Sequence, residues 1–179
     1  DYDFVVAEIS SYQASDLTVS PQIAMFTNLF YVHSEWHNGH ENYCRDKVHL
    51  IAHQKDGDIF FANARNQQLM DYTAAFSFRR RLYDVADGFY AENRSLYYQG
   101  NKILDLSELK LSGTHNLDNL AGVFSILKYL NIDIKAAAES LKEFEPLPHR
   151  LQKVAVKNNV LFVNDSISTA PEAAIGAIN

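Results

Sequence analysis

The sequence predicts an α/β fold with a mainly parallel sheet flanked by helices. Short, nearly continuous apolar runs at residues 4–9, 23–27 and 58–63 are typical of strands buried on both faces. Segments with apolar residues at helical spacing alternate with later runs of this kind, and such alternation indicates a parallel sheet. Apolar residues make up 47% of the 179 residues, which is enough to fill a core.

The first half of the chain gives the following elements in order. Residues 4–9 and 23–27 are predicted to be strands, and residues 38–53 a helix because Tyr43, Lys47, Leu50 and Ile51 recur at helical spacing. The predicted elements after this helix are a strand at 58–63, a helix at 66–75, a strand at 81–86 and a hairpin of strands 95–98 and 102–105 around Gly100-Asn101.

The second half begins with a clear apolar stripe. The stripe predicts a helix over 115–129, followed by a helix over 134–144 that packs against it. Pro146-Leu147-Pro148 disfavours helix, so we place a domain boundary there, with one domain at 1–147 and the start of another at 148–179. Beyond the boundary we expect a hairpin of strands 151–156 and 160–163, then a helix that begins near Pro171.

Composition and charge exclude several classes of partner. The net charge of -6 and the absence of a long Lys/Arg run argue against nucleic acid or an anionic membrane surface. Arg79-Arg80-Arg81 is the only basic cluster, and we interpret it as a solvated loop or strand edge. The single cysteine, Cys44, excludes an internal disulfide and fits the reducing cytoplasm, where we expect the protein to reside.

The two ends of the sequence suggest a piece of a longer protein. The chain starts without methionine directly before an apolar run, and it stops inside an apparent amphipathic helix. No apolar run approaches the roughly 20 residues that span a bilayer, and no secretory leader opens the chain.

Several polar residues stand where ligands commonly bind. Glu8 ends the first predicted strand, and ligands of open α/β sheets bind at strand ends; a structural ion pair is the alternative. Asn116 and Asn119 are three residues apart on one helical face, so their carboxamides can read the edge of a flat polar ring. The alternative for Asn116 is ordinary helix capping. His33 and His37 have the spacing of a helical zinc pair, but no third ligand stands nearby.

Four polar motifs together resemble those of the Mur ligases, the ATP-dependent amino-acid-adding enzymes of peptidoglycan synthesis. The resemblance is closest to the UDP-N-acetylmuramoyl-L-alanine:glutamate ligases, the MurD type. It covers nearly the whole chain and is weak over residues 66–112. The motifs are Glu8-Ile9-Ser10-Ser11-Tyr12-Gln13, His115-Asn116-Leu117-Asp118-Asn119, His149-Arg150 and Asn164-Asp165-Ser166.

The resemblance implies a metal site and two catalytic residues. Glu8 matches a Mg²⁺ ligand, and His33 matches a histidine that helps to hold a second Mg²⁺. Lys47 matches a lysine that carries a carbamate, an anionic oxygen ligand suited to Mg²⁺. His33 and Lys47 are therefore the implied catalytic residues. Without the resemblance, Lys47 would be interpreted as an exposed helical lysine beside Asp46.

The resemblance also implies the sites for ATP and for the two substrates. Ser10 and Gln13 match contacts to the nucleotide-sugar. Asn116 and Asn119 match residues around the adenine, Arg150 a contact to the nucleotide, and Asp165 a ribose ligand. Thr169 matches a threonine near the carboxylate of the added amino acid.

The chain departs from the family pattern at three places. Val32 and Glu35 stand where the family has aspartates around its histidine, so the local support of His33 is altered. Ile167 replaces a lysine that D-glutamate-adding members usually have, which leaves L-glutamate open as the substrate. None of the seven glycines is followed by lysine, so the family's phosphate loop is missing and this piece alone should be inactive.

The resemblance thus implies a cytoplasmic ligase that joins D- or L-glutamate to UDP-N-acetylmuramoyl-L-alanine through an acyl phosphate, using ATP and Mg²⁺. Residues 1–147 would be part of the central ATP-binding domain, truncated on its N-terminal side. Residues 148–179 would open a Rossmann-like, glutamate-binding C-terminal domain. We expect a monomer without nucleic-acid or membrane partners. The alternatives are a ligase similar to folylpolyglutamate synthase and a non-catalytic paralogue that binds a UDP-sugar.

Overall fold

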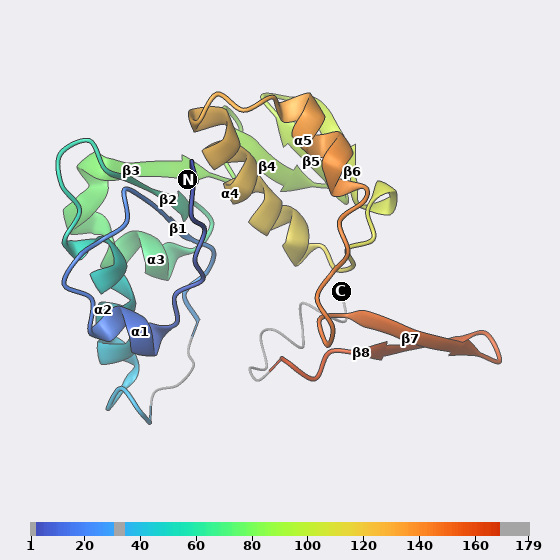
Figure 1. Cartoon of the computed structure of the whole chain (residues 1–179), viewed down its shortest axis with the longest axis horizontal. Coiled ribbons are helices and arrows are strands. Elements are labelled where there is room, and N and C mark those ends of the chain that lie inside the picture. Colours follow the sequence, from blue (N-terminus) through green and yellow to red (C-terminus); the bar gives the residue numbers. More distant parts are fainter. Residues whose placement is uncertain (1–2, 31–34, 169–179) are drawn as a thin grey trace. The chain divides into compact units, whose positions relative to one another are not determined.

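The computed structural model describes residues 3–30 and 35–168, which divide into two compact units (Figure 1). Unit 1 comprises Asp1–Ala62 and Asn66–Arg81, and unit 2 comprises Asn63–Arg65 and Leu82–Asn179. The predicted α/β class is confirmed, because a parallel strand pair in unit 1 is accompanied by helices. The predicted boundary between 147 and 148 stays a prediction.

Unit 1 is built on a parallel pair of strands. β1 (Ile23–Phe26) pairs with β2 (Ile59–Asn63) in a register that sets Ile23 beside Ile59, and β3 (Arg80–Tyr83) completes the order β1-β2-β3. All five residues of β2 are buried, as expected for a strand of a covered parallel sheet. The helices of this unit are α1 (Ser11–Ser15), α2 (His40–Ala52), α3 (Gln67–Tyr72) and the 3₁₀ helix η1 (Ala74–Arg79).

The core of unit 1 joins α2 to the two parallel strands. Tyr43, Cys44, Val48 and Ile51 recur at helical spacing and form the buried face of α2. They belong to one apolar cluster with residues of β1, β2 and α3, including Phe60. The sequence prediction of this helix is confirmed, and its buried stripe fixes which way the remaining side chains of α2 point.

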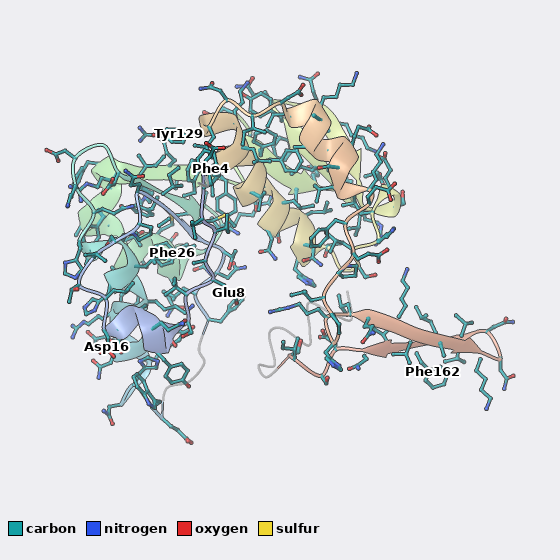
Figure 2. The ribbon with its side chains drawn as sticks, viewed as in Figure 1. Phe4, Glu8, Asp16, Phe26, Tyr129 and Phe162 are labelled. Carbon is teal, nitrogen blue, oxygen red and sulfur yellow. The ribbon has the colours of Figure 1, made fainter. Side chains whose placement is uncertain are left out.

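The predicted first strand is wrong. Residues 4–9 lie outside any helix or strand, and the side chains of Val5 and Val6 are 86% and 97% exposed. A strand requires a hydrogen-bonded neighbour. Among the described residues, no segment pairs with this stretch, which Figure 2 marks at Phe4 and Glu8.

Unit 2 contains an antiparallel sheet covered by a helix. The strands are β4 (Phe89–Glu92), β5 (Ser95–Tyr98) and β6 (Asn101–Asp105), in the order β4-β5-β6. The hairpin β5–β6 was predicted, and its turn has Gln99 and Gly100 at φ of 48° and 80°, as a two-residue primed turn needs. β4 was not predicted.

The helix over this sheet is α4 (His115–Tyr129), followed by α5 (Ile134–Leu141). The predicted stripe of α4 is confirmed, since Leu117, Leu120, Ala121 and Phe124 are buried. The Phe124 ring lies 5.6 Å from the Phe89 ring of β4. The η2 turn (Leu106–Glu108) leads from β6 toward this helix.

The last described elements form the predicted hairpin of β7 (Gln152–Lys157) and β8 (Val160–Asn164). Asn158 and Asn159, both at positive φ, make its turn. Apolar side chains of both strands are exposed, among them Phe162, marked in Figure 2. The hairpin therefore contributes little to the described core. In the described part of the chain, no helix is long and apolar enough to cross a membrane.

Gly113, just before α4, is predicted to tolerate an added side chain poorly. Its φ is +86°, and an added Cβ would lie 2.5 Å from Cε1 of His115 and 2.9 Å from Cδ1 of Leu151. Gly100 is the matched control, because its φ is +80° but nothing lies within 4 Å of an added Cβ. Gly100→Ala should lower the free energy of unfolding by about 1–2 kcal/mol for the positive φ alone. Gly113→Ala should cost more in urea unfolding; equal costs would contradict the close packing.

Candidate active site

Lys47 lies on α2 and is half buried. Its Nζ is 5.6 Å from the centroid of the Tyr43 ring, one turn earlier on the helix. Burial lowers the pKa of Lys47, and the nearby Cys44 and Glu8 oppose that change. A lysine with a lowered pKa has a larger neutral fraction at neutral pH, and the neutral amine is the form that can react with CO₂. Lys47 is thus not the fully exposed helical lysine of the alternative interpretation.

Glu8 is the predicted metal ligand that the structure places near Lys47. Its side chain is exposed on the segment before α1, close enough for its charge to act on the Lys47 amine. His33 lies outside the described residues. Within residues 3–30 and 35–168, no group of three His, Cys, Asp or Glu side chains could hold a metal ion. The described portion of the predicted metal site therefore consists of Glu8 and Lys47.

Ser10 and Gln13, the predicted contacts to the nucleotide-sugar, form the N-terminal capping box of α1. The Ser10 hydroxyl accepts from the backbone N–H of Gln13 at 3.2 Å. In return, the side-chain Oε1 of Gln13 accepts from the backbone N–H of Ser10 at 2.9 Å. Both residues are exposed. The Ser-x-x-Gln spacing is a recognised signature of a helix start, so the sequence held the signal for α1 that we missed.

His37 lies in a buried hydrogen-bonded chain that the sequence did not reveal. Its Nδ1 is 2.6 Å from Asp46 Oδ2, its Nε2 is 3.0 Å from Ser11 Oγ, and its side chain is fully buried. Both ring nitrogens therefore have protein partners. This arrangement disfavours the zinc pair of His33 and His37, because a metal-bound histidine needs one nitrogen free for the metal.

Asn116 and Asn119 lie in the first half of α4 and are half buried. Asn116 Nδ2 donates to the carbonyl of Ser112 at 2.7 Å, so its amide faces back along the chain instead of capping the helix. In the described part of the chain, the Asn119 side chain makes no hydrogen bond. Its donors and acceptor remain available to a ligand.

The base of the β7–β8 hairpin brings two of the sequence motifs together. The Leu151 amide donates to Asp165 Oδ1 at 3.0 Å, and the side chains of Asn164 and His149 are hydrogen-bonded at 2.9 Å. The Ser168 hydroxyl also donates to Asp165. The hydrogen bond from Ser168 makes the largest contribution to holding the pKa of Asp165 below its usual range, and the bond from the Leu151 amide acts in the same direction. Arg150 is exposed beside this turn, and Thr169 lies outside the described residues.

The sequence analysis also missed two carboxyl groups of unit 2, those of Asp84 and Asp118. The side chain of Asp84 is fully buried, with Oδ1 3.0 Å from Arg65 Nη2 and with no partner for Oδ2 among the described residues. Burial raises the pKa of Asp84. It also raises the pKa of Asp118, which lies on α4 between Asn116 and Asn119 and is further affected by the charge of Asp84.

Comparison with solved structures identifies the fold as that of the Mur ligases. MurF from Acinetobacter baumannii matches with a TM-score of 0.72 and 16% identity, over 93% of this chain and 38% of that one. MurF from Thermotoga maritima in complex with ADP matches with a TM-score of 0.62 and 19% identity, over 89% of this chain and 38% of that one. At these identities the likeness concerns the fold alone.

Sequence comparison then establishes the family. The profile of the Mur ligase middle domain matches residues 1–127, and the chain therefore belongs to the Mur ligase family. A UDP-N-acetylmuramoylalanine–D-glutamate ligase of Bacillus mycoides is 33% identical over 98% of this chain and 41% of its own length. A UDP-N-acetylmuramoyl-L-alanine–L-glutamate ligase of Xylella fastidiosa is 32% identical over 99% of this chain and 38% of its own length. The chain thus spans about two fifths of these relatives.

The raised pKa of Asp118 predicts a pH-dependent stability difference. A carboxyl whose pKa is raised by folding stabilises the folded state fully below its unfolded pKa of about 3.9 and loses that contribution as the pH rises through its folded value. Asp118→Asn should therefore be more stable than wild type near pH 7, and the difference should shrink toward about pH 4.

Urea unfolding at several pH values measures this difference. Asp87→Asn is the matched control, because Asp87 is exposed in the same unit. A stability gain of Asp118→Asn that stays constant with pH, or that appears equally in Asp87→Asn, would contradict the raised pKa.

Proposed function

We propose that the full-length protein is an ATP-dependent ligase that joins glutamate to UDP-N-acetylmuramoyl-L-alanine in peptidoglycan synthesis. The observation that carries the proposal is the half-buried Lys47, which has a lowered pKa and lies within electrostatic reach of Glu8. The relatives named as glutamate ligases match nearly the whole of this chain and support the same reaction.

The proposed reaction must activate a carboxylate, which is a poor electrophile because its negative charge repels nucleophiles. Transfer of the γ-phosphoryl group of ATP to the alanyl carboxylate gives an acyl phosphate and ADP. The glutamate amine then attacks the acyl carbon, phosphate leaves, and the nitrogen loses a proton to give the amide. Both steps bring negative groups together, so charge compensation is the main demand on the site.

Lys47 and Glu8 fit the role of Mg²⁺ ligands, together with His33. A neutral Lys47 amine can add to CO₂ and lose a proton, which yields a carbamate whose oxygen suits a hard cation. Mg²⁺, when bound, supplies positive charge against the phosphates and the carboxylate. The fit rests on the donor chemistry of Glu8 and on the lowered pKa of Lys47. We propose Lys47 and His33 as the catalytic residues.

The nucleotide and substrate contacts are proposed for the polar residues that the sequence motifs singled out. Asn116 and Asn119 would contact the adenine, and Asp165, kept ionised by its lowered pKa, would accept from the ribose hydroxyls with Arg150 close to the nucleotide. Ser10 and Gln13 would contact the nucleotide-sugar, and Thr169 the glutamate. Since ATP is consumed, we expect the reaction to take place in the cytoplasm. We also expect the enzyme to be a monomer.

ADP release by the full-length protein tests the proposed function. We expect ADP only when ATP, Mg²⁺, UDP-N-acetylmuramoyl-L-alanine and glutamate are all present. Release with a folate acceptor in place of the UDP-sugar would favour the folylpolyglutamate synthase alternative. Binding of the UDP-sugar without ADP release under any condition would favour the non-catalytic paralogue.

Asn119→Ala should raise the KM for ATP by roughly two- to tenfold, because a lost hydrogen bond to the base removes roughly 0.5–1.5 kcal/mol of binding. The KM for the UDP-sugar should change little. Ser125→Ala is the matched control, since the Ser125 hydroxyl on the same helix donates to the carbonyl of Ala121. Steady-state kinetics with each substrate varied in turn measures both constants, and an equal rise in both would make Asn119 structural.

Ile167 predicts the stereochemistry of the added amino acid. Ile167 is 48% exposed, and its side chain cannot donate a hydrogen bond to a carboxylate, as the lysine expected there would. The glutamate must then be anchored elsewhere, and we expect L-glutamate to be used at least as well as D-glutamate. Parallel assays with the two enantiomers at equal concentration decide this, and a strong preference for the D form would contradict it.

A further inference from the structure

The Ser11–His37–Asp46 chain links two helices that carry different parts of the proposed site. Ser11 is the first residue of α1, next to Ser10 and two residues before Gln13. Asp46 lies on α2, directly before Lys47. His37 contacts both, with Nδ1 2.6 Å from Asp46 and Nε2 3.0 Å from Ser11. One imidazole therefore bridges the helix of the proposed sugar contacts and the helix of the proposed metal-organising lysine.

The donors and acceptors of this chain can be assigned from the chemistry of the groups. An ionised carboxylate only accepts, so His37 Nδ1 donates to Asp46. Nε2 on the other side of the ring is hydrogen-bonded to the Ser11 hydroxyl. Both ring nitrogens of His37 are thus used, and the bridge fixes one relative position of α1 and α2.

Aromatic packing holds the imidazole in place. The Trp36 ring lies 4.5 Å and the Tyr43 ring 5.3 Å from the His37 ring, both edge-on, and Tyr12 of α1 lies 5.4 Å away. Tyr43 is the residue whose ring also lies under the Lys47 ammonium. The same aromatic group therefore contacts both the bridge and the lysine.

The order Ser–His–Asp also occurs in nucleophilic hydrolases, but burial argues against that chemistry here. Ser11 is 4% exposed and its hydroxyl points at a fully buried imidazole. A nucleophile has to reach an external carbonyl carbon, which a buried hydroxyl cannot do. The arrangement suits a structural link better than a nucleophile.

We propose that His37 is a positioning residue for the nucleotide-sugar: through Ser11 and Asp46 it holds Ser10 and Gln13 of α1 at a fixed place relative to Lys47 of α2. The inference rests on the proposed function, because the sugar contacts and the role of Lys47 belong to it. The bridge determines where the acceptor substrate sits, and none of its three residues is among the proposed nucleotide contacts.

The test uses the full-length enzyme with Ser11→Ala and Asp46→Ala, and with Ser11→Thr as the variant that keeps a hydroxyl. Losing one hydrogen bond of the bridge should raise the KM for UDP-N-acetylmuramoyl-L-alanine roughly three- to tenfold, with the KM for ATP within about twofold. Ser11→Thr should recover most of the loss. Ser15→Ala is the matched control, since the Ser15 hydroxyl on the same helix donates to the carbonyl of Tyr12, and it should leave both constants unchanged.

Other outcomes would overturn the proposal. Equal changes in both KM values, a loss of kcat alone, or the same effect from Ser15→Ala would show a merely structural role. Labelling of Ser11 by a fluorophosphonate would reveal a nucleophile. If a variant does not fold, the remaining variants decide the question, because the bridge has two independent hydrogen bonds. If wild type shows no glutamate-dependent ADP release, the proposed function fails, and calorimetric binding of the UDP-sugar to the same variants still tests the bridge.

Discussion

Burial of β2 is the constraint on which the arrangement of unit 1 depends. All five of its residues are inside the core, so the strand needs a hydrogen-bonded neighbour and a covering helix. β1 supplies the parallel neighbour, and α2 supplies part of the cover through residues such as Val48 and Ile51. Because this apolar stripe fixes the rotation of α2, Lys47 is held at the margin of the core, half buried. The burial that stabilises the sheet therefore also lowers the pKa of the lysine that the proposed reaction uses.

Unit 2 shows a similar relation between packing and function on α4. Its buried stripe faces the sheet of β4 to β6, which leaves Asn116 and Asn119 half buried beside that stripe. Asp84 is a less favourable feature of this unit, since one of its oxygens is buried and has no partner in the part of the chain that the structure describes. Such a group costs stability unless a proton or a ligand compensates it.

The sequence predicted secondary structure best where the residues of one segment are sufficient to determine it. The stripes of α2 and α4 were sufficient to locate both helices, and turn residues such as Gly100 and Asn158 located two hairpins. Residues 4–9 were misassigned because an apolar run indicates burial only if a neighbouring strand exists, which the run itself does not show.

The candidate site was predictable only in part, because a local sequence pattern does not show which distant residues become neighbours. Motif resemblance pointed to Lys47 and Glu8, and the structure places them within electrostatic reach of each other. The bridge through His37 depends on partners 26 and 9 residues away, a relation that no local pattern encodes. For His37 the sequence showed only the spacing of a zinc pair without a third ligand, and both of its hydrogen bonds disfavour such a pair.

The central claim is that α2 presents Lys47 in a state that takes up CO₂ as a carbamate. Carbon-13 NMR of the full-length enzyme in ¹³C-labelled bicarbonate measures this directly, with Lys47→Arg as the reference that cannot form the carbamate. We expect a carbamate resonance in wild type that is absent from Lys47→Arg. Identical spectra of the two proteins, with or without such a resonance, would contradict it.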